Sequence, residues 1–300
     1  MSRPGGKRRA VTTHGETIRV LEAGEEEALE RFLLRYATSS MFLRSNLRQG
    51  GIVDRGAIYQ ATYAALLRDG EIASAAAHCW NGMLVLQAPV ATQQVAVVAT
   101  AATGRAIAGI VGPLTQVRRA REGLALGTRP TFTDSAEDLF HLDLRDLQVP
   151  KLLSSGGAMC RRSTPADYPK LAEWRVAYSQ ETFRRPVSEA LGRESRDEVE
   201  RLSAEGAQFV LEVGGRLVSC CTFNARLPDL VQIGGVFTPV LLRQRGYGRA
   251  VVAGALLAAR EAGTAGAILF TGRGNEAAQK AYSALGFVRV GDYGLVILQA

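Results

Sequence analysis

The sequence contains few of the residues that build metal centres or disulfide frameworks. It has four cysteines and three histidines among 300 residues. The cysteines form no CxxC motif, and the histidines lie far apart along the chain. This spacing does not match a zinc site, so we expect no metal. Four unpaired thiols are typical of a protein in the reducing cytoplasm, which is the location we predict.

A long uninterrupted apolar run is also missing. The most apolar region, Val95 to Val111, is interrupted by Gly104, Arg105 and Gly109. It is short for a membrane span, which needs about 20 apolar residues. We therefore predict a buried helix followed by a buried strand in this region, and no membrane partner.

Positive charge is concentrated at the N-terminus. The net charge is +7, and four positive residues fall in the first nine positions. This segment lacks the apolar core of a secretory signal, so residues 1–14 are predicted to be a basic flexible tail. We find no basic face with interleaved aromatic residues elsewhere, so no specific nucleic-acid partner is expected. A nucleic-acid-binding protein is the rival suggested by the pI of about 9.5.

Apolar residues make up 47% of the chain, enough for a packed core, and the chain repeats itself. LLRDGEIASAAAHCW and LEVGGRLVSCCTFNA both read as strand, glycine turn and strand, with Ser74 aligned with Ser219. RVLEAGEEEALERFL resembles CRRSTPADYPKLAEW, and Pro-Val pairs begin at Pro89 and Pro239. We predict two copies of one α/β unit, residues 15–150 and 151–300, divided where VPKLLSSGG interrupts the pattern.

The second copy contains a glycine loop at the start of a predicted helix. Three strands precede the loop, the helix begins near Gly246, and a strand (GAILFT) and a helix (NEAAQKAYSAL) follow. FVRVGDYGLVIL is interpreted as a closing hairpin. The amides at a helix N-terminus favour an anion, and Gly246 and Gly248 allow its close approach. Arg243, Arg245 and Arg249 add positive charge to the loop.

The motif of this loop is RxxGxG. The dinucleotide pattern GxGxxG fails because Val251 occupies the third glycine position, and no Walker sequence is present. By itself the motif also fits an ordinary glycine turn before a basic helix. VFTPVLLRQRGYGRAVVAGAL and ILFTGRGNEAAQKAYSALGF together, however, resemble two adjoining motifs of the GNAT superfamily of acyl-CoA-dependent N-acetyltransferases. The resemblance covers roughly residues 160–298.

The resemblance implies an α/β (α+β) fold of two tandem GNAT-like domains, each with a mixed, mostly antiparallel central sheet flanked by helices. It also implies acetyl-CoA as co-substrate, with the coenzyme pyrophosphate held by loop amides. Asn275 is either a coenzyme contact or a helix cap. The implied cofactor-binding residues, in addition to Asn275, are Val236, Phe237, Thr238, Arg243, Gln244, Arg245, Gly246, Tyr247, Gly248 and Arg249.

The implied reaction is direct attack of a neutral amine on the thioester, through a tetrahedral oxyanion, with coenzyme A leaving as a thiolate. Tyr282 matches the family's tyrosine and is the candidate acid for the leaving sulfur; the alternative is packing beside Leu285 and Phe287. A backbone amide around Phe237, at a bulge, is the expected oxyanion donor. No general base can be identified, and the family often uses ordered water. Glu181 either contacts the acceptor or is a solvated charge at a helix end.

The first copy lacks these features. After Pro89 it has no RxxGxG, and Arg121 stands where Tyr282 would be. Arg44 and Asn46 are either polar contacts in a cleft or ordinary packing residues. We therefore predict a cytoplasmic N-acetyltransferase with one active site, in the second copy, acting on a small-molecule or peptide amine. A non-catalytic acyl-CoA sensor and an enzyme using a different acyl donor are the alternatives. A homodimer through an exposed hairpin edge stays open.

Overall fold

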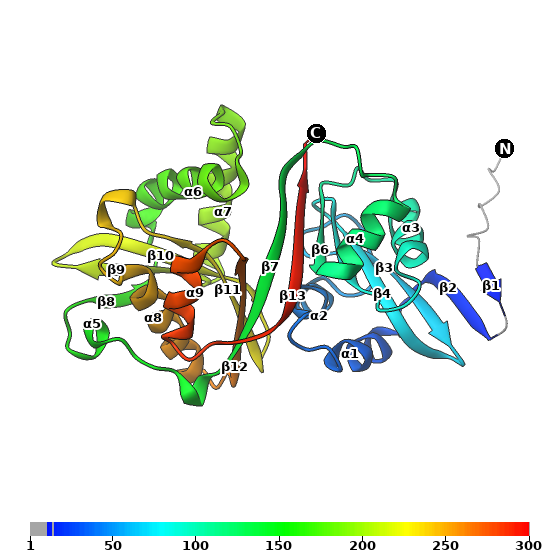
Figure 1. Cartoon of the computed structure of the whole chain (residues 1–300), viewed down its shortest axis with the longest axis horizontal. Helices are drawn as coiled ribbons and strands as arrows, with labels where there is room; N and C mark the ends of the chain where they lie inside the picture. The colour runs from blue at the N-terminus through cyan, green and yellow to red at the C-terminus, as the bar shows by residue number, and fades with distance from the viewer. Residues whose placement is uncertain (1–10, 14, 300) are drawn as a thin grey trace. The chain divides into compact units, whose positions relative to one another are not determined.

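The structure, a computed structural model, describes residues 11–13 and 15–299. Most of the predicted basic tail therefore lies outside the described residues. The chain divides into two compact units, one formed by the residues up to Ser135 together with those from Tyr293 onward, the other by Ala136–Asp292 (Figure 1). Each unit is a mixed sheet flanked by helices.

The division differs from the predicted boundary between residues 150 and 151. The chain enters the second unit within β7 (Thr131–Asp143) and returns to the first within β13 (Val288–Leu298). Residues Glu137–Asp143 of β7 pair with β12 (Gly266–Gly272), so they belong to the sheet of the second unit. The internal sequence repeat does not indicate that the chain crosses between the two units within these strands.

The first unit has the strand order β1-β2-β3-β4-β5-β6-β13. Most neighbours are antiparallel, but β5 and β6 run parallel. The strands are β1 (Val11–Thr13), β2 (Glu16–Val20), β3 (Ala61–Arg68), β4 (Glu71–Cys79), β5 (Met83–Gln87) and β6 (Gly109–Pro113), with the end of β13.

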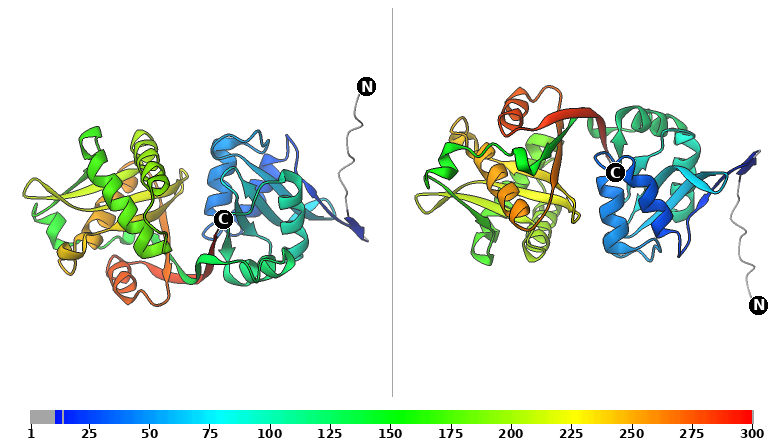
Figure 2. Two further views of the ribbon diagram at one scale, coloured as in Figure 1. Left: turned by 90° about the horizontal axis from the view of Figure 1, so that it is seen from above. Right: turned by 90° about the horizontal axis from the view of Figure 1, so that it is seen from below.

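Helices cover both faces of this first sheet (Figure 2). The core under α3 and α4 contains Val95, Ala99 and Val117, which pack on residues such as Leu66 and Leu84. The predicted buried helix and strand of the apolar region are confirmed as α3 and β6. The helices are α1 (Glu26–Leu34), α2 (Met41–Gly50), α3 (Thr92–Thr103) and α4 (Leu114–Gly123).

Two polar residues of α2 are packed inside the first unit. Arg44 is only 4% exposed and donates to Glu30 at 2.9 Å, so it is not a solvated arginine. Asn46 is buried and donates to the Cys79 thiol.

The second unit has the strand order β7-β12-β11-β10-β9-β8, and β11 and β12 are its parallel pair. The remaining strands are β8 (Met159–Arg162), β9 (Gln208–Val213), β10 (Arg216–Arg226) and β11 (Leu230–Phe237). The helices and short 3-10 turns are η1 (Leu144–Asp146), α5 (Lys151–Ser154), η2 (Pro165–Asp167), α6 (Tyr168–Phe183), α7 (Glu189–Ala204), η3 (Val240–Leu242), α8 (Tyr247–Glu261) and α9 (Glu276–Ser283).

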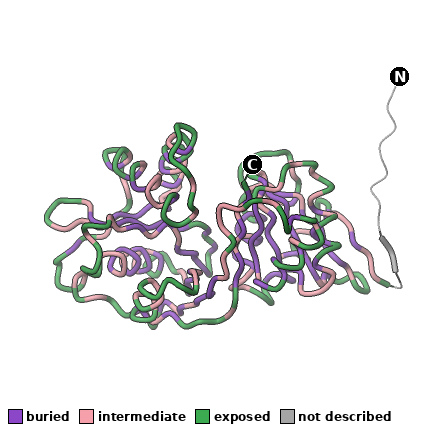
Figure 3. The backbone as a smooth tube through the Cα atoms, turned by 45° about the horizontal axis from the view of Figure 1, so that its top comes forward, coloured by how far each residue is buried: buried purple, intermediate pink, exposed green. Residues whose placement is uncertain are grey.

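The second sheet lies between two helical layers (Figure 1). α8 packs its small and branched residues, among them Val251, Ala255 and Leu256, on one face of the sheet. α6 packs Leu171 and Trp174 on the other face. The strands between these layers are the most continuously buried part of the unit (Figure 3). Because α8 is apolar at the predicted 3.6-residue spacing, it is held against the sheet and its N-terminus is fixed.

One predicted element is wrong. FVRVGDYGLVIL forms a single strand, β13, and not a hairpin. Gly291 sits inside this strand without the positive φ that a tight turn would need, and Tyr293–Ile297 pair with β6. Pairing along its length, which the sequence does not encode locally, keeps the strand extended.

No helix among the described residues is long and apolar enough to cross a membrane. The same residues contain no cluster of three His, Cys, Asp or Glu side chains that could hold a metal ion.

Candidate active site

The two parallel strands of the second unit separate partway along their length. In the described chain, β11 pairs with β12 only from Leu230 to Gln232. β12 continues beside β7 as far as Gly272, while the last five residues of β11, Ile233–Phe237, leave it. An open strand edge therefore faces the gap, and its peptide groups can pair with an extended ligand.

A bulge lies on β11 at this point. The register with β10 runs from Cys220 opposite Phe237 to Thr222 opposite Gly234, so β11 holds one extra residue. Gly235 has φ 54°, and neither it nor Val236 has a register partner on β10. The bulge expected around Phe237 is thus present, and glycine meets its backbone requirement.

Side chains fix the end of β11. The Ser219 hydroxyl, which is fully buried, donates to the Phe237 carbonyl at 2.9 Å and lies 2.9 Å from the Thr238 hydroxyl. The Phe237 ring packs 6.1 Å from the Trp174 ring, measured between centroids. These contacts hold Phe237 and Thr238 at the head of the loop that follows.

The loop between β11 and α8 has an unusual backbone. Gln244 has φ 63° although it is not glycine, and Gly246, the N-cap of α8, has φ 76°. The first backbone bond of the helix runs from the Ala250 N–H to the Gly246 carbonyl. Within the described chain, no acceptor is recorded for the amides of Gln244 through Arg249. These six N–H groups are available to an anion at the positive end of the helix dipole.

The side chain of Arg249, like the loop amides, has a hydrogen-bond donor without a recorded acceptor among the described residues. Its Nε atom is buried and has no hydrogen-bond partner in the described chain. A β-carbon on Gly246 would lie 3.9 Å from Arg249 Nη2, so the guanidinium is next to the loop backbone. A buried donor without an acceptor costs free energy, so an anion at this place would stabilise the loop. The pyrophosphate of coenzyme A fits this donor set.

Arg243 and Glu181 form an ion pair. Arg243 Nη2 donates to Glu181 Oε2 at 2.5 Å, and Arg243 Nε donates to the Thr238 carbonyl at 3.0 Å. Both side chains are more than 40% exposed. Glu181, predicted as either an acceptor contact or a solvated charge, therefore lies beside the loop arginine. Arg245 is exposed and forms no recorded ion pair among the described residues.

The predicted residues of α9 take up their expected positions in the helix. The Asn275 side chain accepts from the Ala278 amide at 3.2 Å, so it caps the helix. Tyr282 is partly buried and packs edge-on against Phe287. Burial raises the pKa of Tyr282 well above its usual value, and the nearby Tyr178 and Cys221 add to the increase. Its phenol therefore stays protonated at neutral pH.

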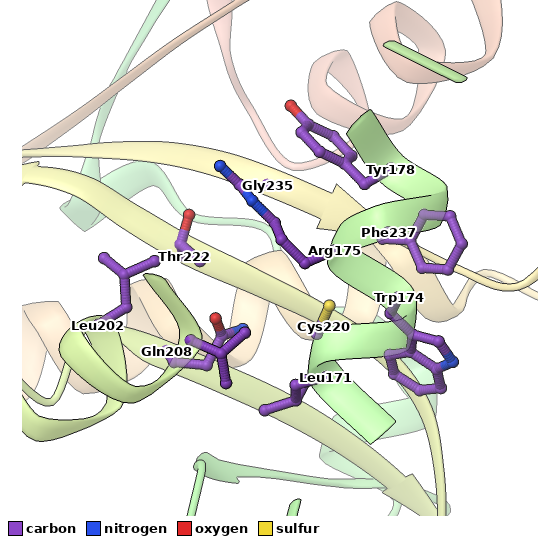
Figure 4. A pocket seen from close by; sticks show the side chains of 11 residues that line it. Leu171, Trp174, Arg175, Tyr178, Leu202, Gln208, Cys220, Thr222, Gly235 and Phe237 are labelled. Carbon is purple, nitrogen blue, oxygen red and sulfur yellow. The ribbon is translucent and has the colours of Figure 1, made fainter. Parts of the chain in front are cut away.

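A pocket lies between α6, α7 and the bulged strand (Figure 4). Its wall is mostly apolar, and Arg175, Gln208 and Thr222 supply polar groups. Arg175 Nη2 donates to Glu198 of α7 at 2.6 Å. The lining residues are Leu171, Trp174, Arg175, Tyr178, Val199, Leu202, Gln208, Cys220, Thr222, Gly235 and Phe237.

The Cys220 thiol is buried in the wall of this pocket. Burial raises its pKa to about 12, although the charge of Arg175 and a hydrogen bond from the Phe237 backbone act in the opposite direction. Among the described residues, Gly235 and Val236 are the two bulge residues without a register partner on β10 or β12.

Sequence reasoning missed Arg175, Trp174 and the functional position of Ser219. Ser219 was found only as one member of the repeated serine pair. Arg175 lies in α6 among other charged residues, and nothing in the local pattern distinguishes it from a solvated surface cation.

Comparison with known proteins identifies a family that the second unit resembles and solved structures with a similar fold. Residues 168–287 match the model of the acetyltransferase (GNAT) family. No curated protein matches this sequence. Solved structures similar to most of the chain include a Drosophila protein, with a TM-score of 0.64, 13% identity and coverage of 94% of this chain and 98% of that one.

Two further similar structures are those of a GCN5-related N-acetyltransferase and a tandem GNAT protein. A GCN5-related N-acetyltransferase from Sphaerobacter thermophilus has a TM-score of 0.57 at 14% identity and covers 95% of this chain and 96% of its own. A tandem GNAT protein from the clavulanic acid biosynthesis pathway has a TM-score of 0.50 at 14% identity, with coverage of 94% and 97%. The fold of this chain is therefore that of two GNAT-like domains in tandem.

Proposed function

Because residues 168–287 form a domain of the acetyltransferase (GNAT) family, we propose that this chain is an N-acetyltransferase. It transfers an acetyl group from acetyl-CoA to a primary amine, and its one active site lies in the second unit. The acceptor is a small molecule or a peptide amine.

One observation carries this proposal. The six amides from Gln244 to Arg249 belong to the loop and first turn at a helix N-terminus and have no recorded acceptor in the described chain. Had side chains or carbonyls of the protein satisfied these amides, no pyrophosphate could bind there. Arg249 Nε, a buried donor in the first turn of the same helix, also has no hydrogen-bond partner in the described chain.

The open edge of β11 supplies the next part of the mechanism. Val236, Phe237 and Thr238 would pair with the amides of the pantetheine arm, as an added strand does. The thioester would then lie at the bulge, where the Val236 amide donates to the developing oxyanion. We assign this role to Val236 because it lies at the bulge and has no register partner on β10 or β12 in the described chain.

Tyr282 would donate a proton to the departing sulfur. Its raised pKa keeps the phenol protonated, as a general acid must be before the reaction. The α6–α7 pocket reaches the bulge at Gly235 and Phe237, so the amine would approach from that side. No side chain is assigned as general base, and water in the pocket would take the amine proton.

The test is a titration of coenzyme A followed by an assay of thiol release with a panel of amines. We expect saturable binding, amine-dependent release of CoA, and a large loss of release with Tyr282→Phe. Saturable binding without release for any amine would favour the non-catalytic acyl-CoA sensor. Absence of binding would end the proposal.

A further inference from the structure

The α6–α7 pocket holds one guanidinium at the bulge where the amine must arrive. Arg175 extends from α6 across the strands toward Thr222 (Figure 4). A β-carbon added to Gly235 would lie 3.4 Å from Arg175 Nη1, so this nitrogen lies directly over the bulged backbone. The Arg175 side chain is 20% exposed, so it is accessible but largely shielded from water.

The bonding of Arg175 leaves part of the guanidinium available. Nη2 is used by Glu198 at 2.6 Å, and the plane of the group lies over the Tyr178 ring at 5.2 Å. For Nη1 and Nε, the described chain provides no recorded hydrogen-bond acceptor. An arginine held in place by one carboxylate can bind a second one with little further loss of side-chain entropy.

The rest of the wall indicates which acceptors suit the pocket. Its apolar residues are largely buried, with Trp174 8% and Phe237 6% exposed, and no Asp or Glu is among its lining residues. Glu198 and Glu137 are close enough to raise the pKa of Tyr178, whose largest cause is burial, but neither lines the pocket. A polycationic amine would therefore find no lining carboxylate, whereas a carboxylate would find Arg175.

We propose that Arg175 selects an acceptor that carries a carboxylate beside its amine, as an α-amino acid does. This inference rests on the proposed transfer reaction and names its substrate class. The carboxylate binds Arg175 Nη1, and the amine faces the bulge at Gly235. Arg175 is a specificity-determining residue that binds the acceptor.

The experiment compares matched amines. L-Leucine and L-leucinamide differ in the carboxylate, and leucinamide is the more readily deprotonated amine, so chemistry alone favours the amide. We expect the unmodified protein to show kcat/KM at least about tenfold higher for leucine, because a charge-assisted pair discriminates against its neutral analogue. Arg175→Gln should abolish this preference, mainly through KM, and Arg175→Lys should retain part of it.

Glu198→Gln distinguishes recognition from structural support. If the pair only braced α6 against α7, Arg175→Gln and Glu198→Gln would lose activity alike. If Arg175 binds the acceptor, Glu198→Gln removes the negative charge that competes with the acceptor carboxylate and should keep or strengthen the preference for leucine. Coenzyme A titration of both variants checks that the fold and the donor site persist. An equal loss in both variants would overturn the proposal, as would an unmodified protein that prefers leucinamide.

Binding measurements separate this inference from the transfer reaction. Leucine should bind the complex with coenzyme A, and Arg175→Gln should reduce its affinity by about tenfold or more. If no amine is acetylated but this pattern of leucine binding holds, the transfer proposal fails and the assignment of Arg175 stands. If amines are acetylated but leucine binding is the same in Arg175→Gln, the assignment of Arg175 fails alone.

Discussion

The two units have similar sheets, but they differ in whether the peptide amides of their central loops have hydrogen-bond acceptors. In the first unit, side chains of α4 and β4 satisfy amides of the loop after β5: the Ala88 amide donates to Gln116 Oε1 at 2.6 Å, and the Val90 amide donates to the Ser74 hydroxyl at 3.2 Å. In the second unit, the amides of Gln244–Arg249 have no recorded acceptor in the described chain. The same fold thus contains one loop whose amides have acceptors within the protein and one loop whose amides have none recorded in the described chain.

The strands around each loop differ in the same direction. Both parallel pairs, β5 with β6 and β11 with β12, have three residues of register. In the first unit, a β-carbon on Gly112 would lie 2.8 Å from the Leu86 carbonyl, so the two strands stay close beyond that register. In the second unit, five residues of β11 depart from β12. Of the two parallel pairs in the described chain, the one in the second unit therefore opens beyond its register, next to the bulge at Gly235.

The largest effect that we predict is on coenzyme binding. Gly248→Glu puts a carboxylate in the first turn of α8, where the pyrophosphate would bind, and should weaken the affinity for coenzyme A at least about 100-fold through like-charge repulsion. Isothermal titration measures it. The control is Gln94→Glu in the first turn of α3, an exposed position of the first unit, which should leave the affinity unchanged. An effect of similar size in both variants would contradict the difference between the loops.

The next prediction concerns Tyr282, which has Arg121 at the corresponding place in the first unit. Tyr282→Phe should lower kcat about 10- to 100-fold and leave the affinity for coenzyme A unchanged, because only proton donation is lost. Since the folded-state pKa is raised, the phenol is protonated from acid to well above neutral pH, so loss of its proton should not cause a fall of kcat between pH 7 and 9. Tyr36→Phe, at an exposed tyrosine, is the control. A normal kcat in Tyr282→Phe would remove this residue from the mechanism.

The repeated serines allow a matched comparison of stability and activity. The Ser74 hydroxyl donates to the Val90 carbonyl at 2.6 Å, and the Ser219 hydroxyl donates to that of Phe237 at 2.9 Å. Each change to alanine should cost about 1–3 kcal/mol of unfolding free energy, because a buried acceptor loses its donor. Only Ser219→Ala should also reduce acetyl transfer, about tenfold. Denaturant unfolding and the thiol-release assay measure the two effects, and equal loss of activity would show that both units serve the reaction.

The smallest effect should come from Glu181. Glu181→Gln releases Arg243 for the coenzyme and should tighten binding about two- to fivefold at low salt, with little change in stability because the pair is exposed. Glu194→Gln removes the partner of Arg185 and changes the net charge equally, but away from the loop. A similar gain in that control would indicate a general charge effect.

Much of the second unit could be predicted from local patterns. The residues of α8 follow a 3.6-residue spacing, and Asn275 carries the side chain of a helix cap, so both elements were expected and are confirmed. The repeated Ser74 and Ser219, with the Pro-Val pairs, indicated the two copies. These features depend on neighbours within a few residues, which is why the sequence alone determined them.

Tertiary structure decided the rest. The strands β7 and β13 pass between the units because their partners lie far away in the chain, and no local pattern encodes those partners. Whether a loop amide has a hydrogen-bond acceptor depends on side chains that are distant in the sequence. The Gln116 side chain accepts from the Ala88 amide, 28 residues away, but the described chain has no recorded acceptor for the amides of Gln244–Arg249. The sequence does not distinguish Arg175 from a surface cation. In the structure, packing of α6 places its guanidinium over Gly235. Local sequence sets backbone preference, but long-range packing decides which polar groups stay available for a ligand.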